Sequence, residues 1–315
     1  MPSASEQISK QVAYESERRA RLGVPAAAGG VLFLISAILV NSVISALPSV
    51  GLLQGLEPAL RGTVTPAVSA RAGEVRYLSH HAFGLIAGSV LEAIAAIALT
   101  LVLLFLLSAT RFRRVETPRA AGPLVLAGGV GLAVFGIASQ VVRAIRTHEF
   151  ATGHNFSEAA VEHALTKGAA NLAIGYLGLL APLVLALGLI MVLLSATRVG
   201  LITRWQRGLG IATAIVILPL FAGIFYLQLV PAAWMVSVGF LFLGRLPGGD
   251  PPAWAAGVAC PWPSPAELRA AKEGSSTAAV GAAATAPAGG ADVAPAPSAN
   301  GRSSRKRRRK RGARG

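Results

Sequence analysis

A run of hydrophobic residues from His81 to Arg111 constrains the fold of this chain more than any other feature. The run, HAFGLIAGSVLEAIAAIALTLVLLFLLSATR, exceeds the ~20 apolar residues that an α-helix needs to cross a bilayer. It has neither the polar face of a helix on a soluble protein nor the two-residue alternation of a transmembrane β-strand. The run therefore predicts a helix that spans a membrane.

Further long apolar runs extend this prediction to a protein with several spans. Hydrophobic residues make up 53% of the chain and charged residues only 14%, whereas about a quarter of the residues of a soluble domain are charged. The 35 glycines are expected where membrane helices pack closely against one another. We expect an all-α transmembrane bundle of six helices, followed by a disordered polybasic cytoplasmic tail.

The polar segments divide the chain into four predicted parts. Residues 1–23 are a cytoplasmic N-terminal segment, and residues 24–246 are a six-span transmembrane domain. Residues 247–273 are a strap rich in Pro and Trp that continues into a short helix, and residues 274–315 are a disordered linker with a polybasic tail. The last span, of about 16 residues, covers only ~24 Å of helix, so whether it crosses completely stays open. The predicted spans are residues 24–47, 81–109, 123–145, 168–197, 208–227 and 231–246.

Basic residues lie mainly on one side of these spans. The N-terminal segment and the two short loops on its side carry 11 Lys or Arg residues, whereas the two longer loops carry three each. Cytoplasmic loops are enriched in Lys and Arg. We therefore expect a multi-pass plasma-membrane protein with both termini in the cytoplasm.

The strap contains two tryptophans, Trp254 and Trp262. Tryptophan is enriched at the level of the lipid headgroups. A strap that folds back on the cytoplasmic end of the bundle is equally consistent with this composition. Both alternatives stay open.

A short motif recurs at the ends of two predicted spans. The sequence LLSATR occupies Leu106–Arg111 and again Leu193–Arg198, at an offset of 87 residues. The same offset aligns Gly88 with Gly175. The second and fourth spans are therefore predicted to be copies of one another.

The first and third spans share a second motif at an offset of 99 residues. The sequence AGGV occupies Ala28–Val31 and again Ala127–Val130, and this offset aligns Asn41 with Gln140. A duplicated helical hairpin whose first copy has a longer outer loop explains both offsets. Two spans per copy preserve the orientation, so the repeat is parallel, and the fifth and sixth spans form a degenerate third copy.

Glu92 is a carboxylate near the middle of the second span. Gly84, Gly88 and Glu92 lie on one helix face because four residues make slightly more than one turn. The two glycines form a seam that another helix can approach closely, so we expect Glu92 to point into the bundle. The predicted helix-packing residues are Gly84, Gly88 and Gly175. The predicted intramembrane polar cluster is Asn41, Glu92, Ser139, Gln140 and Arg143.

Two roles are open for Glu92. An ionised carboxylate at this depth costs several kcal/mol unless it is paired or faces water. It is either a functional group that gates protons or cations, or a structural group held by hydrogen bonds, chiefly to Gln140 and Arg143. Leu179 occupies the equivalent position of the second copy, which favours the structural role.

Motifs for catalysis, cofactors or metals are not evident, so we expect neither an enzyme nor a bound cofactor or metal. Cys260 is the single cysteine, which excludes a disulfide within the chain. The two aspartates, Asp250 and Asp292, lie in the predicted cytoplasmic tail, which argues against a Ser-His-Asp triad. The histidines lack the spacing of a zinc site and are interpreted as solvated loop residues: His80, His81, His148, His154 and His163.

The C-terminal tail is the most basic part of the chain. Residues 302–314 contain nine Lys or Arg and no acid. Such a segment binds the anionic leaflet, at ~1 kcal/mol per basic residue, and also binds RNA without sequence preference. The predicted polyanion-binding residues are Arg305, Lys306, Arg307, Arg308, Arg309, Lys310 and Arg311.

Two stretches resemble uncharacterised multi-span membrane proteins of high-GC actinobacteria. They are LLSATRVGLITRWQRGLGI at Leu193–Ile211 and GFLFLGRLPGGDPPAWAAGVACPWPSPAELRAA at Gly239–Ala271. The resemblance spans roughly residues 20–270. It implies a bacterial plasma-membrane protein without an assigned activity, and it supplies no catalytic residues.

Three classes of function stay open. The first is a non-enzymatic scaffold or interaction protein, favoured by the small-residue seams. The second is a small transporter or channel that uses Glu92. The third is a ribosome- or insertase-associated factor that acts through residues 302–314. The expected partners are the bilayer, anionic headgroups, a second copy of the chain and, less favoured, nucleic acid.

Overall fold

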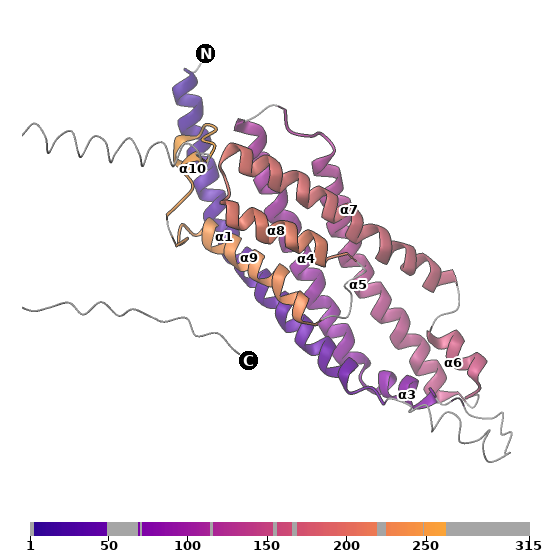
Figure 1. The fold of residues 1–315 in the computed structure, drawn as a ribbon. Coiled ribbons are helices and arrows are strands. Elements are labelled where there is room, and N and C mark those ends of the chain that lie inside the picture. Colours follow the sequence, from indigo (N-terminus) through magenta and orange to yellow (C-terminus); the bar gives the residue numbers. More distant parts are fainter. Residues whose placement is uncertain are drawn as a thin grey trace, which may run out of the picture. The chain divides into compact units, whose positions relative to one another are not determined.

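The protein is all-helical in the part that its computed structural model describes. Four helices are long and apolar enough to cross a membrane, which makes the chain a multi-pass membrane protein (Figure 1). They are α1 (Ala4–Ser45), α4 (Ala82–Arg113), α5 (Ala121–Thr152) and α7 (Ala169–Val199). The described residues are 3–48, 69, 71–113, 116–153, 156–165, 169–218, 225–247 and 249–262.

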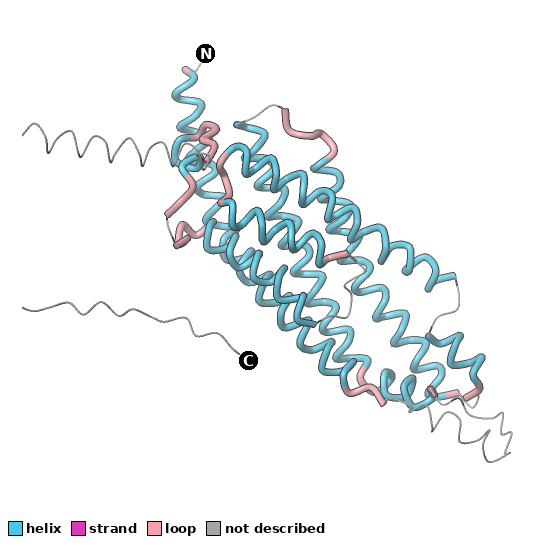
Figure 2. The backbone as a smooth tube through the Cα atoms, viewed as in Figure 1, coloured by secondary structure: helices cyan, strands magenta, loops and turns pink. Residues whose placement is uncertain are grey.

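Shorter helices complete the bundle and its two ends (Figure 2). They are α3 (Ala72–His80), α6 (Glu158–Leu165), α8 (Arg204–Val216), the 3₁₀ helix η2 (Phe225–Gln228), α9 (Leu229–Phe242) and α10 (Pro252–Ala256). The long helices pack in chain order, α1 on α4, α4 on α5 and α5 on α7. Helix α8 then packs on α7, and α9 packs on both α8 and α1, so the helices follow one another around a closed ring.

Helix α1 is continuous across the predicted boundary between the N-terminal segment and the first span. Ser3 caps it, because its side chain accepts a hydrogen bond from the backbone N–H of Glu6. The 42 residues give a helix of about 63 Å, roughly twice the ~30 Å of a hydrocarbon core. The polar first half of α1 therefore belongs to the same rod as the apolar second half.

The six-span count is not confirmed, because α8 and α9 have only 13 and 14 residues. Each covers about 20 Å, less than the ~30 Å thickness of the hydrocarbon core. The two helices are antiparallel: Trp234 Nε1 of α9 donates to the Gln206 carbonyl at the start of α8, at 3.0 Å. The Gln206 side-chain amide donates in turn to the Ser237 carbonyl at 3.2 Å.

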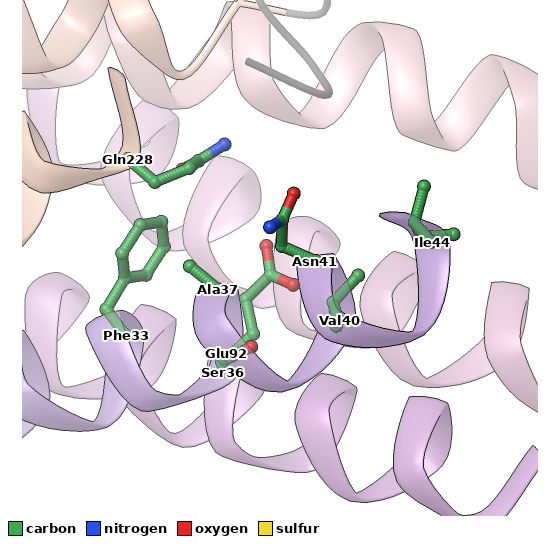
Figure 3. A pocket seen from close by; sticks show the side chains of 8 residues that line it. All are labelled: Phe33, Ser36, Ala37, Val40, Asn41, Ile44, Glu92 and Gln228. Carbon is green, nitrogen blue, oxygen red and sulfur yellow. The ribbon is translucent and has the colours of Figure 1, made fainter. Parts of the chain in front are cut away.

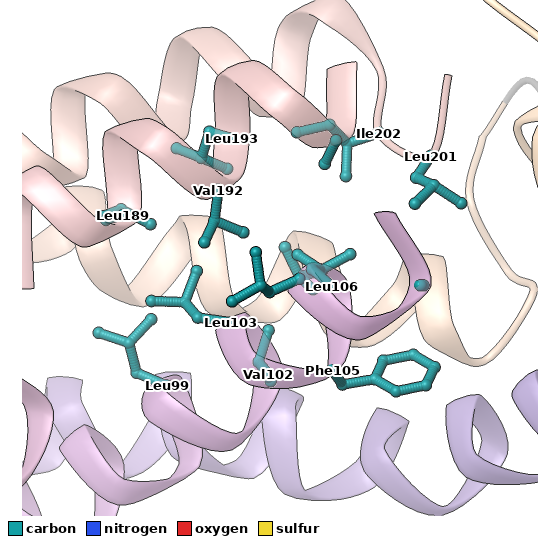
Figure 4. Close-up of a cluster of buried hydrophobic side chains, with 14 of the residues drawn as sticks. Leu99, Val102, Leu103, Phe105, Leu106, Leu189, Val192, Leu193, Leu201 and Ile202 are labelled. Atoms are coloured by element: carbon teal, nitrogen blue, oxygen red, sulfur yellow. The ribbon is translucent and has the colours of Figure 1, made fainter. Parts of the chain in front are cut away.

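The main core lies between α4 and α7 (Figure 4). Branched aliphatic side chains of the two helices interdigitate there, and the turn after α7 closes the cluster. Lipid tails are as apolar as leucine, so close packing rather than water exclusion holds such helices together. The labelled residues are Leu99, Val102, Leu103, Phe105, Leu106, Leu189, Val192, Leu193, Leu201 and Ile202.

One pair of equivalent glycines, Gly29 and Gly128, makes equivalent contacts in the two long hairpins. A Cβ on Gly29 of α1 would lie 2.9 Å from Ala98 Cβ of α4. A Cβ on Gly128 of α5 would lie 2.4 Å from the backbone N of Leu185 on α7. Gly128 is the equivalent of Gly29 at the offset of 99 residues, and Leu185 is the equivalent of Ala98 at the offset of 87 residues. The packing agrees with the predicted duplication of a helical hairpin.

Residues 249–262 fold back on one end of the bundle, as the strap alternative predicts. We call this the strap end. Trp254 Nε1 donates to the Leu201 carbonyl and Trp262 Nε1 to the Ile202 carbonyl, each at 2.9 Å. Both indoles therefore bind the turn after α7. Gly200 in this turn has a φ of +85°, and a Cβ there would lie 2.0 Å from the Cys260 carbonyl oxygen, so the position requires glycine.

A buried ion pair joins α1 to α4 beneath the strap. Arg113 Nη1 and Nη2 donate to the two carboxylate oxygens of Glu15 at 3.0 and 2.7 Å. Arg113 Nε also donates to the Ala253 carbonyl of α10 at 3.2 Å. The paired side chains are 0% and 3% exposed, so one arginine ties together two long helices and the strap.

Arg19 makes a second link at the strap end. Its guanidinium donates to the Leu241 carbonyl at the end of α9 and to the Asp250 carboxylate at 2.7 Å. It also lies 5.0 Å from the centre of the Trp254 ring, which Arg113 approaches to 5.5 Å. Cations near an aromatic face are attracted to it, so Trp254 is held by two guanidinium groups.

Candidate functional site

The face of α4 that carries Glu92 packs against α1. A Cβ on Gly88 would lie 2.8 Å from Val40 Cγ2 of α1, so α1 approaches α4 closely there. Ser36 of α1 donates a hydrogen bond from its hydroxyl to the Gly88 carbonyl at 2.8 Å. Gly84, one turn away, faces Val43 Cγ2 at 3.7 Å. Glu92 continues this face by one turn and is directed toward α1.

Glu92 opens into a cavity of about 140 Å³ between α1, α4 and η2 (Figure 3). The Asn41 amide of α1 points at the Glu92 carboxylate, and the Gln228 amide of η2 extends along the same cavity. Polar side chains from three separate elements thus converge on one space, which is large enough for several water molecules. The lining residues are Phe33, Ser36, Ala37, Val40, Asn41, Ile44, Glu92 and Gln228.

The cavity extends from the middle of the bundle to the end opposite the strap. Glu92 is the tenth residue after Ala82, at the start of α4, which places it about 15 Å along the helix. Ile44, at the other limit of the cavity, is the last residue but one of α1. The cavity therefore leads from membrane depth toward the end of α1 that lies away from the strap.

The composition of the cavity suits a small hard cation or a proton. A carboxylate and two amide carbonyls supply the oxygen ligands that hard cations prefer. In the described part of the chain, no group makes a hydrogen bond to the side chains of Asn41, Glu92 or Gln228. Intramembrane acids usually pair with another residue or face a cavity, and Glu92 lines a cavity.

The predicted partners on α5 do not line this cavity. Arg143 Nη1 donates to Gln140 Oε1 of the same helix at 3.4 Å, and the Ser139 hydroxyl donates to the Gly136 carbonyl at 3.0 Å. Helix α4 meets α5 through Ala93 and Ala96, which pack on Ala133. The residues that line the cavity with Glu92 come from α1 and η2, and none of them comes from α5. The structure thus brings Glu92 together with Asn41, not with Gln140 or Arg143.

Of the predicted packing glycines, Gly175 differs from Gly84 and Gly88. It is exposed, and a Cβ there would have no heavy atom within 4 Å. Helix α5 instead approaches α7 at Gly178, where a Cβ would lie 2.4 Å from Phe135 Cε2. Phe135 is the counterpart of Ser36 at the offset of 99 residues, and its large ring moves the close contact by almost one turn.

Sequence reasoning missed Gln228 as a site residue. Residues Gln228–Pro231 were predicted only as a tight turn between the fifth and sixth spans. A single amide within such an apolar stretch is a signal for a polar site at membrane depth, but it does not identify the partners. Arg305–Arg311 lie outside the described residues, and so does the predicted helix of residues 264–273.

The described residues contain no group of three or more His, Cys, Asp or Glu that could hold a metal ion. Among the histidines, His81 lies with Nδ1 2.9 Å from the Tyr77 carbonyl of the preceding turn. Comparison with protein-family models, with curated proteins and with solved structures finds no match to this chain. The resemblance to actinobacterial membrane proteins therefore stays a prediction.

Proposed function

We propose that this protein is a small transporter or channel for protons or small cations, and that the cavity at Glu92 is its binding site. The observation that carries the proposal is the convergence of Asn41, Glu92 and Gln228 from α1, α4 and η2 on one cavity. A scaffold needs close helix packing but has no use for such a group of polar side chains in lipid, where they are costly.

The short helices α8 and α9 support this proposal. They run antiparallel, and α9 returns to the strap end, where Arg19 binds the Leu241 carbonyl. Each is too short to cross, so the pair enters the membrane from the strap end and leaves on the same side. Helices that end at membrane depth are tolerated where they line a cavity, and transporters bind ions at such places. Gln228, directly before α9, lies at this position.

This arrangement gives four crossings plus a re-entrant pair and keeps both termini on one side. The excess of basic residues on that side makes it the cytoplasm, so the cavity at Glu92 leads outward. The close packing of α1 on Gly84 and Gly88 still supports the alternative that the protein is a scaffold. The ribosome-associated alternative depends on the tail, which lies outside the described residues.

Ion flux into proteoliposomes tests the proposal. We expect the wild-type protein to dissipate a proton, sodium or potassium gradient. Glu92→Gln should slow the flux about tenfold or more, because glutamine has neither the negative charge nor the titratable group of glutamate. Glu149→Gln is the matched control, since Glu149 is exposed on α5 and lies outside the cavity. Flux of all three ions equal to that of empty liposomes, or equal flux in both variants, would contradict the proposal.

A further inference from the structure

A second cavity lies between α1 and α4 near the strap end, away from Glu92. Its volume is about 430 Å³. It is bounded by residues 18–22 of α1 and residues 101–108 of α4, and its composition changes from one end to the other. The lining residues are Arg18, Arg21, Leu22, Leu101, Leu104, Phe105 and Ser108.

The polar residues gather at the end of this groove that is nearer the strap. Arg18 and Arg21 directly precede the apolar half of α1, which begins near Val24. Ser108 is close to the end of α4, whereas Leu101 is seven residues deeper, or about 10 Å. The groove therefore begins at headgroup level with two arginines and a hydroxyl and continues along leucines toward the membrane interior.

The mouth of the groove carries a net positive charge. Arg21 Nη2 lies 2.5 Å from Glu17 Oε1, an exposed ion pair on one helix face. The Arg18 guanidinium lies 5.0 Å from the centre of the Tyr14 ring, and no carboxylate within the described residues pairs with it. One positive charge is thus left at the mouth, and its guanidinium has the planar donor geometry that suits phosphate.

We propose that this groove binds an anionic phospholipid of the leaflet at the strap end. The phosphate contacts Arg18 and Arg21, and one acyl chain lies along Leu22, Leu101 and Leu104. Leu101 is 48% exposed, so the groove is open to lipid along its side. Basic pockets between membrane helices bind anionic headgroups in this way. The site is separate from the basic tail and does not depend on the proposed ion transport.

Lipid retention measured by native mass spectrometry tests this site. We expect the purified wild-type protein to retain phosphatidylglycerol and to release phosphatidylcholine with the same acyl chains. The double variant Arg18→Gln/Arg21→Gln should bind phosphatidylglycerol about tenfold more weakly, and Arg18→Lys/Arg21→Lys should lose less, because it keeps the charge. The matched control is Arg204→Gln/Arg207→Gln, since these residues are at the strap end but outside the groove.

Three results would overturn the assignment. They are equal retention of the two lipids by the wild-type protein, unchanged retention by Arg18→Gln/Arg21→Gln, and binding of glycerol phosphate alone as strongly as the intact lipid. The last result would mean a phosphate site rather than a lipid groove. The comparison of the two lipids uses the wild-type protein, so it holds even if the double variant does not fold.

Discussion

At the strap end, Glu15 and Arg113 form a buried ion pair that stabilises the packing of α1 on α4. Glu15 and Arg113 are almost fully buried, and each satisfies the charge of the other through two hydrogen bonds. Gln11 adds a third, from its amide to Glu15 Oε1 at 2.9 Å. Removal of one partner from such a pair leaves an uncompensated buried charge.

Glu15→Ala is therefore expected to destabilise the protein by about 3–5 kcal/mol. Glu17→Ala is the control, two residues along the same helix. Its exposed pair with Arg21 is worth about 0–1 kcal/mol. Thermal unfolding of both variants in detergent measures the difference. An equal fall in Tm would show that the buried pair contributes no more than the exposed one.

The orientation of Glu92 was predictable as a residue-level feature, but its partner was not. The spacing of Gly84, Gly88 and Glu92 indicates one face, and in the structure the two glycines face α1 and Glu92 lines the cavity beside it. Helix α4 contacts both α1 and α5, and their sequences offer similar polar candidates. Ala93 and Ala96 of α4 pack on Ala133 of α5, and the side of α4 that carries Gly88 and Glu92 packs on α1. That choice depends on packing, which periodicity along one helix does not contain.

At the scale of helices, substitution of two glycines by alanine is predicted to have opposite effects on stability. A Cβ on Gly128 would lie 2.4 Å from backbone of α7, which side-chain rotation does not relieve. Gly128→Ala should therefore cost about 1–3 kcal/mol, typical of overpacking. Gly175→Ala should be neutral or stabilising by up to about 1 kcal/mol, because its site is open and alanine favours the helix.

Unfolding of these two variants in the same detergent tests this contact. The expected order of Tm is Gly128→Ala below wild type, and Gly175→Ala equal to or above it. The reverse order would mean that α5 and α7 do not pack through Gly128.

Apolar runs predicted the positions of the long helices well. The span predicted at residues 81–109 is α4, Ala82–Arg113, and the span predicted at 168–197 is α7, Ala169–Val199. The last two runs were interpreted as crossings for the same reason. Hydrophobicity alone does not give the length of a helix. The structure describes 13 residues in α8 and 14 in α9, which does not confirm these two crossings.

At the scale of the whole molecule, the strap depends on residues that are distant in sequence. Glu15 and Arg113 are 98 residues apart, and Arg19 and Asp250 are 231 apart. No local pattern predicts which charges pair across such separations. The composition of residues 249–262 did allow a strap folded back on the bundle, and the structure shows its indoles bound to the turn after α7.

The two cavities carry side chains of opposite charge and lie toward opposite ends of the bundle. The groove at Arg18 and Arg21 is positive and lies at the strap end, whereas the cavity at Glu92 carries a carboxylate and leads away from the strap. In the proposed arrangement of four crossings and a re-entrant pair, the strap end faces the cytoplasm and the cavity at Glu92 leads outward. The proposed function therefore depends most on the access of water to Glu92 from outside.

Thiol labelling in intact cells measures this access most directly. Single cysteines replace Asn41 and Gln228 in a Cys260→Ser background, and a charged, membrane-impermeant thiol reagent is added outside. Ile97→Cys on α4 is the control, since Ile97 is 49% exposed and lies outside the cavity. We predict that Asn41→Cys and Gln228→Cys react and that Ile97→Cys, which faces lipid, does not. If neither cavity position reacts faster than Ile97→Cys, the cavity is closed to water and the proposed function is wrong.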